Sequence, residues 1–305
     1  TSLEALGCAV VPITMDRNGT APLAEARLAL QILAALQRLR PDVVFSYTIK
    51  NNIYSGLACR LLRIPFAPNV TGLGPAFNRK GLLNRLVRGL YRQAFRRART
   101  VFFQNTQDRD VFLQAGLVDS QVARLLPGSG VDLQQFSARP LPPDTDGIVF
   151  LFVARLLWDK GLGVLAEAAR DLRISHPHAR IHVLGPLDPD SASAVSAAQM
   201  QDWIAEGLFH WLGSTDDVRP MLEAAHCVVL PSYYREGTPR SLIEACAIGR
   251  PIITTDMPGC RDVVIPGETG FLCAPRDAGA LAAAMQAFLA LDPAQRAEIG
   301  RASCR

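Results

Sequence analysis

Short apolar runs alternate with helical patterns along most of this chain, and the alternation occurs in both halves. In the first half the predicted strands are residues 8–13, 42–48, 66–71 and 101–106. In the second half they are residues 148–154, 180–184, 209–212, 226–230, 252–255 and 270–273. Because strands joined through helices run parallel with right-handed crossovers, the pattern predicts an α/β fold built from doubly wound sheets.

The helical patterns lie between these strands. They cover residues 23–39, 52–62, 82–97, 108–115, 162–174, 191–206, 217–224, 239–248 and 278–291. A proline-rich polar stretch at residues 137–147 is the best candidate for a linker. We therefore predict two Rossmann-like domains, residues 1–137 and 138–305, that face a cleft. Because the chain opens on a helix-end pattern at Leu3–Gly7, the first domain is expected to lack at least one strand.

The composition is that of a globular protein, with 49% hydrophobic residues. No run of 18 apolar residues is present, so no membrane-spanning helix is expected, and no secretory signal is apparent. The seven cysteines include no C-x-x-C pair. Free cysteines in apolar patterns favour a reducing, cytoplasmic location.

Positive charge is concentrated in the first half. Residues 43–107 contain eleven Lys and Arg but no Asp or Glu, which predicts a negatively charged partner. Within this region, one helical pattern carries Arg85, Arg88, Arg92 and Arg96 on one face and apolar residues such as Leu86 on another. Such a helix can rest on an anionic membrane surface. The alternative is a helix packed on its sheet with a solvated basic face.

The stretch His226–Ile252 reads as a buried strand, a polar loop and a helix that begins near Pro239. The loop after a strand of a parallel sheet faces the ligand crevice, and the free N–H groups of the following helix attract an anion, most often phosphate. Glu236 precedes the helix and Glu244 lies inside it. Their position suits an anionic ligand rich in hydroxyls, such as a nucleotide sugar. The alternative is a loop charge and a solvated helix residue.

Two cations follow the first strand of the second half. Arg155 and Lys160 are expected at the same sheet edge as Glu236, where an arginine fork and a lysine could hold a diphosphate. The alternative is a pair of surface charges.

Four motifs occur in order in the second half. They are R-L-x-x-x-K-G at 155–161, L-P-S-x-x-x-E-G-x-P-x-x-L-x-E-A at 230–245, G-R-P-I-I-x-T-D-x-P-G-C-x-x-V-V at 249–264 and G-x-T-G-F-L at 267–272. Together they resemble the family 4 retaining glycosyltransferases of two-domain GT-B fold. In the first half, residues 46–50, 70–74 and 90–92 resemble the subgroup that acts on polyprenyl-diphosphate-linked, capsular or O-antigen glycans.

The resemblance implies a role for each matching residue. Arg155 and Lys160 would hold the donor diphosphate, and Glu236 would contact the hydroxyls of the donor sugar. Gly237, Thr238 and Pro239 would line the site beside the sugar or phosphate, and Glu244 would accept hydrogen bonds from the ribose. The expected donor is a UDP-linked hexose or N-acetylhexosamine.

Two positions depart from the family pattern. Thr238 stands where many relatives carry a large apolar residue, and Asp262 stands where glutamate is commoner. The first departure is expected to bear on the choice of sugar. No cofactor or metal is expected, and His176 and His178 are interpreted as a solvated turn.

The residues available for catalysis favour retention of anomeric configuration. All five histidines lie at 176 or later, and residues 43–107 have no carboxylate, so this part of the first half offers no base for an inverting transfer. The leaving phosphate would then accept the proton of the acceptor hydroxyl. Asp16 is the one acid near the first predicted strand that could serve instead.

Two other classes of function remain open at this point. A nucleotide-sugar epimerase of similar fold would convert the donor without any acceptor. A non-enzymatic protein would use its basic region to bind nucleic acid or membrane, although this region lacks the interleaved aromatic residues of many nucleic-acid-binding surfaces. For the transferase we expect a nucleotide-sugar donor, a lipid-linked or free glycan acceptor, an anionic membrane surface and no nucleic acid as partners.

Overall fold

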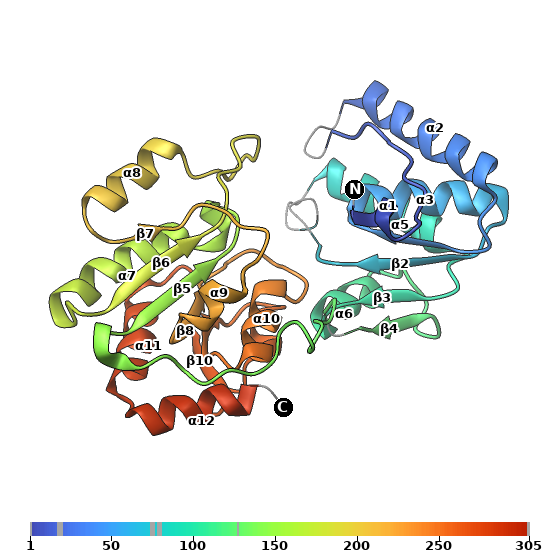
Figure 1. The fold of residues 1–305 in the computed structure, drawn as a ribbon. Coiled ribbons are helices and arrows are strands. Elements are labelled where there is room, and N and C mark those ends of the chain that lie inside the picture. The colour runs from blue at the N-terminus through green and yellow to red at the C-terminus, as the bar shows by residue number, and fades with distance from the viewer. Residues whose placement is uncertain (1, 17–20, 74–76, 78–80, 127, 304–305) are drawn as a thin grey trace. The chain divides into compact units, whose positions relative to one another are not determined.

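The structure, a computed structural model, describes residues 2–16, 21–73, 77, 81–126 and 128–303. The chain divides into two compact units, Thr1–Leu126 (unit 1) and Pro127–Arg305 (unit 2), and each contains its own sheet (Figure 1). The division lies N-terminal to the predicted boundary between residues 137 and 138.

Unit 1 contains a four-stranded parallel sheet with the order β1-β2-β3-β4. Its elements are α1 (Ser2–Ala5), α2 (Pro22–Leu39), β1 (Val44–Tyr47), α3 (Ile49–Leu62), β2 (Phe66–Val70), α5 (Leu82–Phe95), β3 (Val101–Phe103), α6 (Thr106–Gln114) and β4 (Ala123–Leu125). Helix α3 packs against α2, α5 and the first two strands. The short strand β4 was not predicted, because its three residues are too few to show a period.

The strand predicted at residues 8–13 is wrong. The structure has no strand there, and residues 8–15 are mostly exposed. An apolar run becomes a strand only where a neighbouring edge accepts its backbone hydrogen bonds. Here an open cavity of about 510 Å³, lined by Val11, Ile13, Met15 and residues of α2 and β1, separates this run from the edge of β1.

Unit 2 contains a six-stranded parallel sheet with the order β10-β9-β8-β5-β6-β7. Its elements are η1 (Asp144–Asp146), β5 (Val149–Val153), η2 (Trp158–Lys160), α7 (Leu162–Ser175), β6 (Arg180–Leu184), α8 (Ala197–Ala205), β7 (His210–Trp211), α9 (Arg219–Glu223), β8 (Cys227–Leu230), α10 (Arg240–Ile248), β9 (Ile252–Thr255), η3 (Arg261–Val263), β10 (Gly270–Cys273), α11 (Ala278–Ala290) and α12 (Pro293–Ser303). All six predicted strands are present. Helix α8 begins later than predicted because Ser196 caps it, accepting a hydrogen bond from the Gln199 N–H at 3.1 Å.

The two sheets confirm the prediction of an α/β fold with two parallel sheets, and the sheet of unit 2 is doubly wound as predicted. In unit 2, successive strands from β5 run toward one edge of the sheet, and successive strands from β8 run toward the other. The strand order therefore reverses between β5 and β8. In open parallel sheets, ligands bind outside the carboxyl ends of the strands at such a point.

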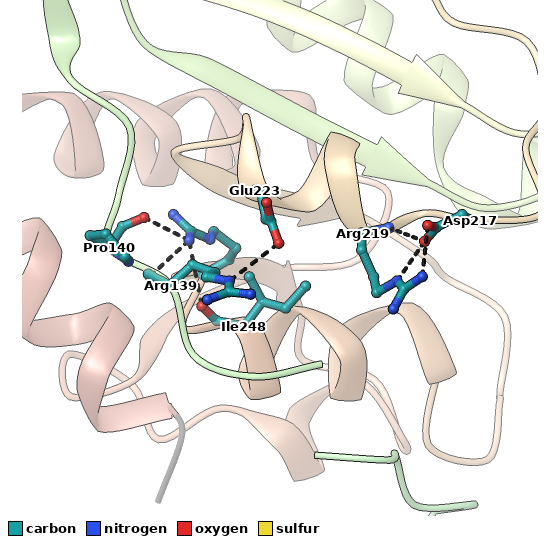
Figure 2. Close-up of polar contacts among 7 residues, drawn as sticks. Arg139, Pro140, Asp217, Arg219, Glu223 and Ile248 are labelled. Carbon is teal, nitrogen blue, oxygen red and sulfur yellow. Dashed lines mark hydrogen bonds and ion pairs between the residues drawn. The ribbon is translucent and has the colours of Figure 1, made fainter. Parts of the chain in front are cut away.

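The proline-rich stretch is held on unit 2 by a buried arginine. Arg250 is fully buried, and its Nη2 donates to the carbonyl oxygens of Arg139 and Pro140, each at 2.8 Å (Figure 2). The Arg139 side chain forms an ion pair with Glu223 at 3.4 Å (Figure 2). The first part of the predicted linker is thus anchored on unit 2 by hydrogen bonds.

A buried histidine, His226, lies directly before β8 and contacts two other segments of unit 2. His226 Nδ1 accepts a hydrogen bond from the Val149 N–H at 3.0 Å, and Nε2 lies 3.4 Å from Asp144 Oδ1. Arg296 holds the other oxygen of Asp144 at 3.0 Å. Burial lowers the pKa of His226; Asp144 opposes this shift, and Arg296 and Arg250 add to it.

We predict that unit 2 loses stability as the pH falls below about 6.5, the ordinary pKa of histidine. His226 binds a proton more readily in the unfolded chain than in the folded protein. Its contribution to the free energy of unfolding is therefore complete above that pH and is lost progressively below it. The slope is at most about 1.4 kcal/mol per pH unit for one histidine. Urea unfolding at pH 7.5 and 5.5 measures it.

The control variant is His226→Asn, whose side-chain oxygen can still accept from the Val149 N–H. It should reduce the dependence of the free energy of unfolding on pH. His182→Gln should reduce this dependence further, because burial also lowers the pKa of His182. An unchanged slope in His226→Asn would contradict the prediction.

Candidate functional site

Two loops meet at the point in unit 2 where the strand order reverses. The loop after β5 carries Arg155 and Lys160, and the loop after β8 carries Glu236. Both loops leave the carboxyl ends of neighbouring strands. The sheet therefore brings the predicted cations and the predicted acid to one edge, although up to about 80 residues of sequence separate them.

Lys160 and Glu236 form an ion pair at this edge. Their side chains are only 16% and 13% exposed. The second oxygen of Glu236, Oε1, accepts a hydrogen bond from Ser232 Oγ at 2.6 Å. Because both carboxylate oxygens are held, Glu236 has one defined position rather than that of a mobile loop charge.

Backbone contacts tie the two loops together. The carbonyl oxygen of Asp159 accepts from the Tyr233 N–H at 3.1 Å, and Ser232 Oγ, whose proton points to Glu236, lies 3.2 Å from the same carbonyl. Gly161, with φ +81°, lies so close to Pro231 that a Cβ would overlap its carbonyl oxygen. Sequence reasoning missed Ser232 and Gly161, although both stand inside the quoted motifs.

A third loop, after β9, supports the backbone that follows Glu236. Gly259 has φ +85°, and a Cβ there would overlap the carbonyl oxygen of Gly237. Asp262 Oδ2 accepts a hydrogen bond from the Gly259 N–H at 2.9 Å. Asp262, which departs from the family pattern, therefore stabilises this turn.

Arg155 lies at the same edge but is held by a different acid. Its side chain is 54% exposed and forms an ion pair with Asp188 Oδ2 at 2.5 Å. The pKa of Tyr234 is raised, chiefly by burial and also by Asp159 and Glu236, while Arg155 opposes the shift. Arg155 is therefore within electrostatic reach of the Glu236 loop. Because exposed ion pairs are weak, an incoming anion could compete with Asp188 for the guanidinium.

Helix α10 begins at Arg240, and its N-cap residue, Pro239, makes no side-chain capping hydrogen bond. Its first N–H groups lack intrahelical acceptors and carry partial positive charge, so this helix end can receive an anion. Thr238, just before it, is half-buried, and a Cβ on Gly128 would lie 3.2 Å from the Thr238 Cβ. The turn at Gly128 thus packs on the helix start.

Glu244 is 8% exposed, and its Oε1 accepts from Arg240 Nε at 2.7 Å. It is therefore not the solvated helix residue of the alternative interpretation. A carboxylate this buried needs donors, and Arg240, which is largely exposed itself, supplies one from the first turn of the same helix.

Helix α5 in unit 1 differs in part from the predicted pattern. Leu86 is 60% exposed and shares the outer side of the helix with Arg85 and Arg96. Arg92 donates to the carbonyl oxygens of Gly116 and Ala115, each at 3.0 Å. Arg88 lies over the Phe77 ring, 5.6 Å from its centre. Two of the four arginines therefore make contacts within unit 1.

Among the described residues, no three His, Cys, Asp or Glu side chains gather in a way that could hold a metal ion. Within the same part of the chain, no helix combines the length and the apolar composition that a bilayer crossing requires.

Two parallel sheets, with this site at the switch point of the second, define a protein of the GT-B fold class. The fold matches the solved structure of HepE from Anabaena in complex with UDP and glucose with a TM-score of 0.78, at 20% identity over 99% of this chain and 82% of HepE. The match to sucrose-phosphate synthase from Thermosynechococcus elongatus has a TM-score of 0.76, at 22% identity over 96% of this chain and 77% of that protein.

Family comparison places the chain more narrowly. Residues 134–303 match the family Glycosyl transferases group 1, and residues 1–128 match the Glycosyl transferase 4-like domain. This chain belongs to the group 1 glycosyltransferases, and both matches agree with the resemblance of its motifs to family 4 glycosyltransferases of GT-B fold.

Two curated relatives are similar to this chain. N,N'-diacetylbacillosaminyl-diphospho-undecaprenol alpha-1,3-N-acetylgalactosaminyltransferase of Campylobacter jejuni is 27% identical over 90% of this chain and 75% of its own length. Putative colanic acid biosynthesis glycosyltransferase WcaL of Escherichia coli is 32% identical over 56% of this chain and 43% of its own length.

Proposed function

We propose that this protein transfers a hexose or N-acetylhexosamine from a nucleotide sugar, with UDP as the nucleotide, to a lipid-linked or free glycan. The observation that carries the proposal is the largely buried Lys160–Glu236 ion pair at the switch point, beside the start of α10, whose N-cap is a proline. The names of the similar proteins supply the substrate classes: the Campylobacter relative acts on an undecaprenol-linked diphosphate, and HepE was solved with UDP and glucose.

In this proposal the donor diphosphate binds between Lys160, Arg155 and the N–H groups at the start of α10. Each charge-assisted hydrogen bond to the diphosphate contributes about 1.5–3 kcal/mol. Glu236 accepts from the sugar hydroxyls, and Gly237, Thr238 and Pro239 lie beside the sugar or phosphate. Glu244 accepts from the ribose hydroxyls.

We propose that the transfer retains anomeric configuration. The bond between the anomeric carbon and the phosphate oxygen breaks, and a bond to the acceptor oxygen forms on the same face. The proton of the acceptor hydroxyl goes to the leaving phosphate oxygen. Lys160 and Arg155 stabilise the charge that develops on that phosphate.

One acid of unit 1 was missed by the sequence analysis and bears on this mechanism. Glu25 is largely buried, and its two oxygens bind Lys50 Nζ at 2.5 Å and the Tyr54 hydroxyl at 2.7 Å. In our proposal Glu25 keeps these two contacts during the transfer and orients Lys50 and Tyr54 instead of acting as a base.

A thermal-shift screen of nucleotide sugars tests the proposal. A true donor at one hundred times its Kd stabilises the protein by about 2.7 kcal/mol. The shift should vanish in Arg155→Ala and in Glu244→Ala. Turnover should need an acceptor, and NMR of the product should show the anomeric configuration of the donor. Conversion of donor without acceptor, or a lack of response to any sugar nucleotide, would overturn the proposal.

We also propose that the outer side of α5 rests on an anionic membrane surface, such as the cytoplasmic face of a bacterial membrane. Leu82 and Leu86 are 82% and 60% exposed on this side, next to Arg85 and Arg96. Apolar side chains between basic ones are typical of interfacial helices. The cysteines that the structure describes are all free thiols, which is compatible with a reducing compartment.

Arg85→Gln combined with Arg96→Gln is expected to weaken binding to vesicles of anionic lipid by about 2 kcal/mol, or roughly 30-fold, because each basic residue contributes about 1 kcal/mol. Co-sedimentation at 0.1 M salt measures the change. The matched control is Arg27→Gln with Arg38→Gln, which removes the same charge from exposed positions of α2. Equal losses in both double variants would contradict a specific role of α5.

A further inference from the structure

Arg276 adopts a backbone conformation that its residue type disfavours. It lies in the turn between β10 and α11 with φ +61°. Arg40 and Arg63 also have positive φ, but they occupy helix C-caps, where this conformation is common. Arg276 instead directly precedes Asp277, the N-cap of α11. A non-glycine residue whose backbone stays in the left-handed region needs an interaction that stabilises this conformation.

The Arg276 side chain provides that interaction. Its guanidinium carbon lies 4.3 Å from the centre of the Tyr233 ring, well inside the range of a cation–π contact. Tyr233 belongs to the loop after β8, two strands away from the turn that carries Arg276. The contact therefore joins the last loop of the sheet to the loop that carries Glu236.

Tyr233 is coupled to Glu236 through its neighbour. The Tyr233 N–H donates to the Asp159 carbonyl, and Ser232 Oγ contacts both that same carbonyl and Glu236 Oε1. The loop is thus held by the backbone contact of Tyr233 with Asp159 and by the contact of the Tyr233 ring with Arg276. Release of the ring would loosen the segment that fixes the Glu236 carboxylate.

We propose that Arg276 is a positioning residue that sets the sugar-binding geometry of Glu236 through Tyr233. The inference rests on the proposed function, in which Glu236 contacts the donor sugar. Loss of the Arg276–Tyr233 contact should therefore weaken the sugar part of donor binding. The nucleotide part should stay intact, because Arg155 and Glu244 belong to other elements.

Arg276→Gly removes the contact with the Tyr233 ring without destabilising the fold, because glycine accepts φ +61° without strain. We expect an equal or higher Tm and an unchanged Kd for UDP. The Kd for the UDP-sugar found in the screen should rise roughly two- to fivefold, the factor that an exposed cation–π contact supplies. Tyr233→Leu should give the same change, and Tyr233→Phe, which keeps the ring, should restore the wild-type ratio of the two Kd values.

The matched control for relief of strain is Arg63→Gly, with φ +59° at the C-cap of α3. It should leave the ratio of the two Kd values unchanged. An unchanged ratio in Arg276→Gly, or an equal loss of UDP and UDP-sugar binding, overturns the inference. If the wild-type protein binds the UDP-sugar no more tightly than UDP, the proposed function fails instead. The two failures are therefore distinguishable.

Discussion

Replacement of Glu236 by alanine is expected to lower kcat/KM by a factor of roughly 10² to 10⁴. The carboxylate holds the Lys160 ammonium and the Ser232 hydroxyl, and in our proposal it also accepts from the donor sugar. Loss of two charge-assisted contacts of about 1.5–3 kcal/mol each accounts for the size of the effect. Steady-state kinetics with the donor from the screen measures it.

Glu236→Gln is the matched variant, because it keeps the shape of the side chain and one acceptor oxygen but removes the charge. It should lie between alanine and the wild type. The Kd for UDP should change less than the Kd for the UDP-sugar, since UDP lacks the sugar that Glu236 contacts.

The ion pair can be tested as a unit. If Lys160 and Glu236 act together, the double variant Lys160→Met, Glu236→Gln should lose less than the sum of the single losses. Strict additivity would mean that the ion pair has no role of its own. Wild-type activity of Glu236→Ala would contradict the assignment of the site.

The second large effect is expected from Gly259→Ala, which should lower kcat/KM about 100-fold. Its Cβ would overlap the carbonyl oxygen of Gly237, so the backbone next to Glu236 must move. A displacement of about 1 Å in a site of this kind can cost a factor of 10² in rate. The unfavourable φ of +85° adds about 1–2 kcal/mol of destabilisation.

Gly267→Ala is the control that separates these two causes. Gly267 has a similar φ of +78°, but a Cβ there meets no atom within 4 Å. It should show the backbone destabilisation in its Tm and keep the activity of the wild type. If both variants lose the same activity, the close approach of Gly259 to Gly237 is not what positions Glu236.

Much of unit 2 could be predicted because its signals are local. The apolar runs at residues 180–184, 252–255 and 270–273 became β6, β9 and β10 with the predicted bounds. Each is short and mostly apolar, and turn residues lie within a few positions of its ends, so local hydrophobic pattern and turn signals were sufficient.

Unit 1 was harder to predict where an element depends on a distant neighbour. Residues 8–13 have the apolar composition of a strand but form none, because the β1 edge lies across a cavity from them. Leu86 matches an apolar stripe by spacing, yet it faces outward. Tyr91 and Phe95 already fill the core side of α5, and the sheet they pack on sets the rotation of the helix.

The sequence by itself determined the succession of most strands and helices along the chain, the family and the loops that carry the candidate residues. These follow from periodicity and motif spacing, which depend on neighbours along the chain. Only the tertiary structure decided the partners: Lys160 with Glu236, Arg155 with Asp188, and Arg276 with Tyr233. These pairs are more than 30 residues apart in sequence, and the order and register of the strands bring them together.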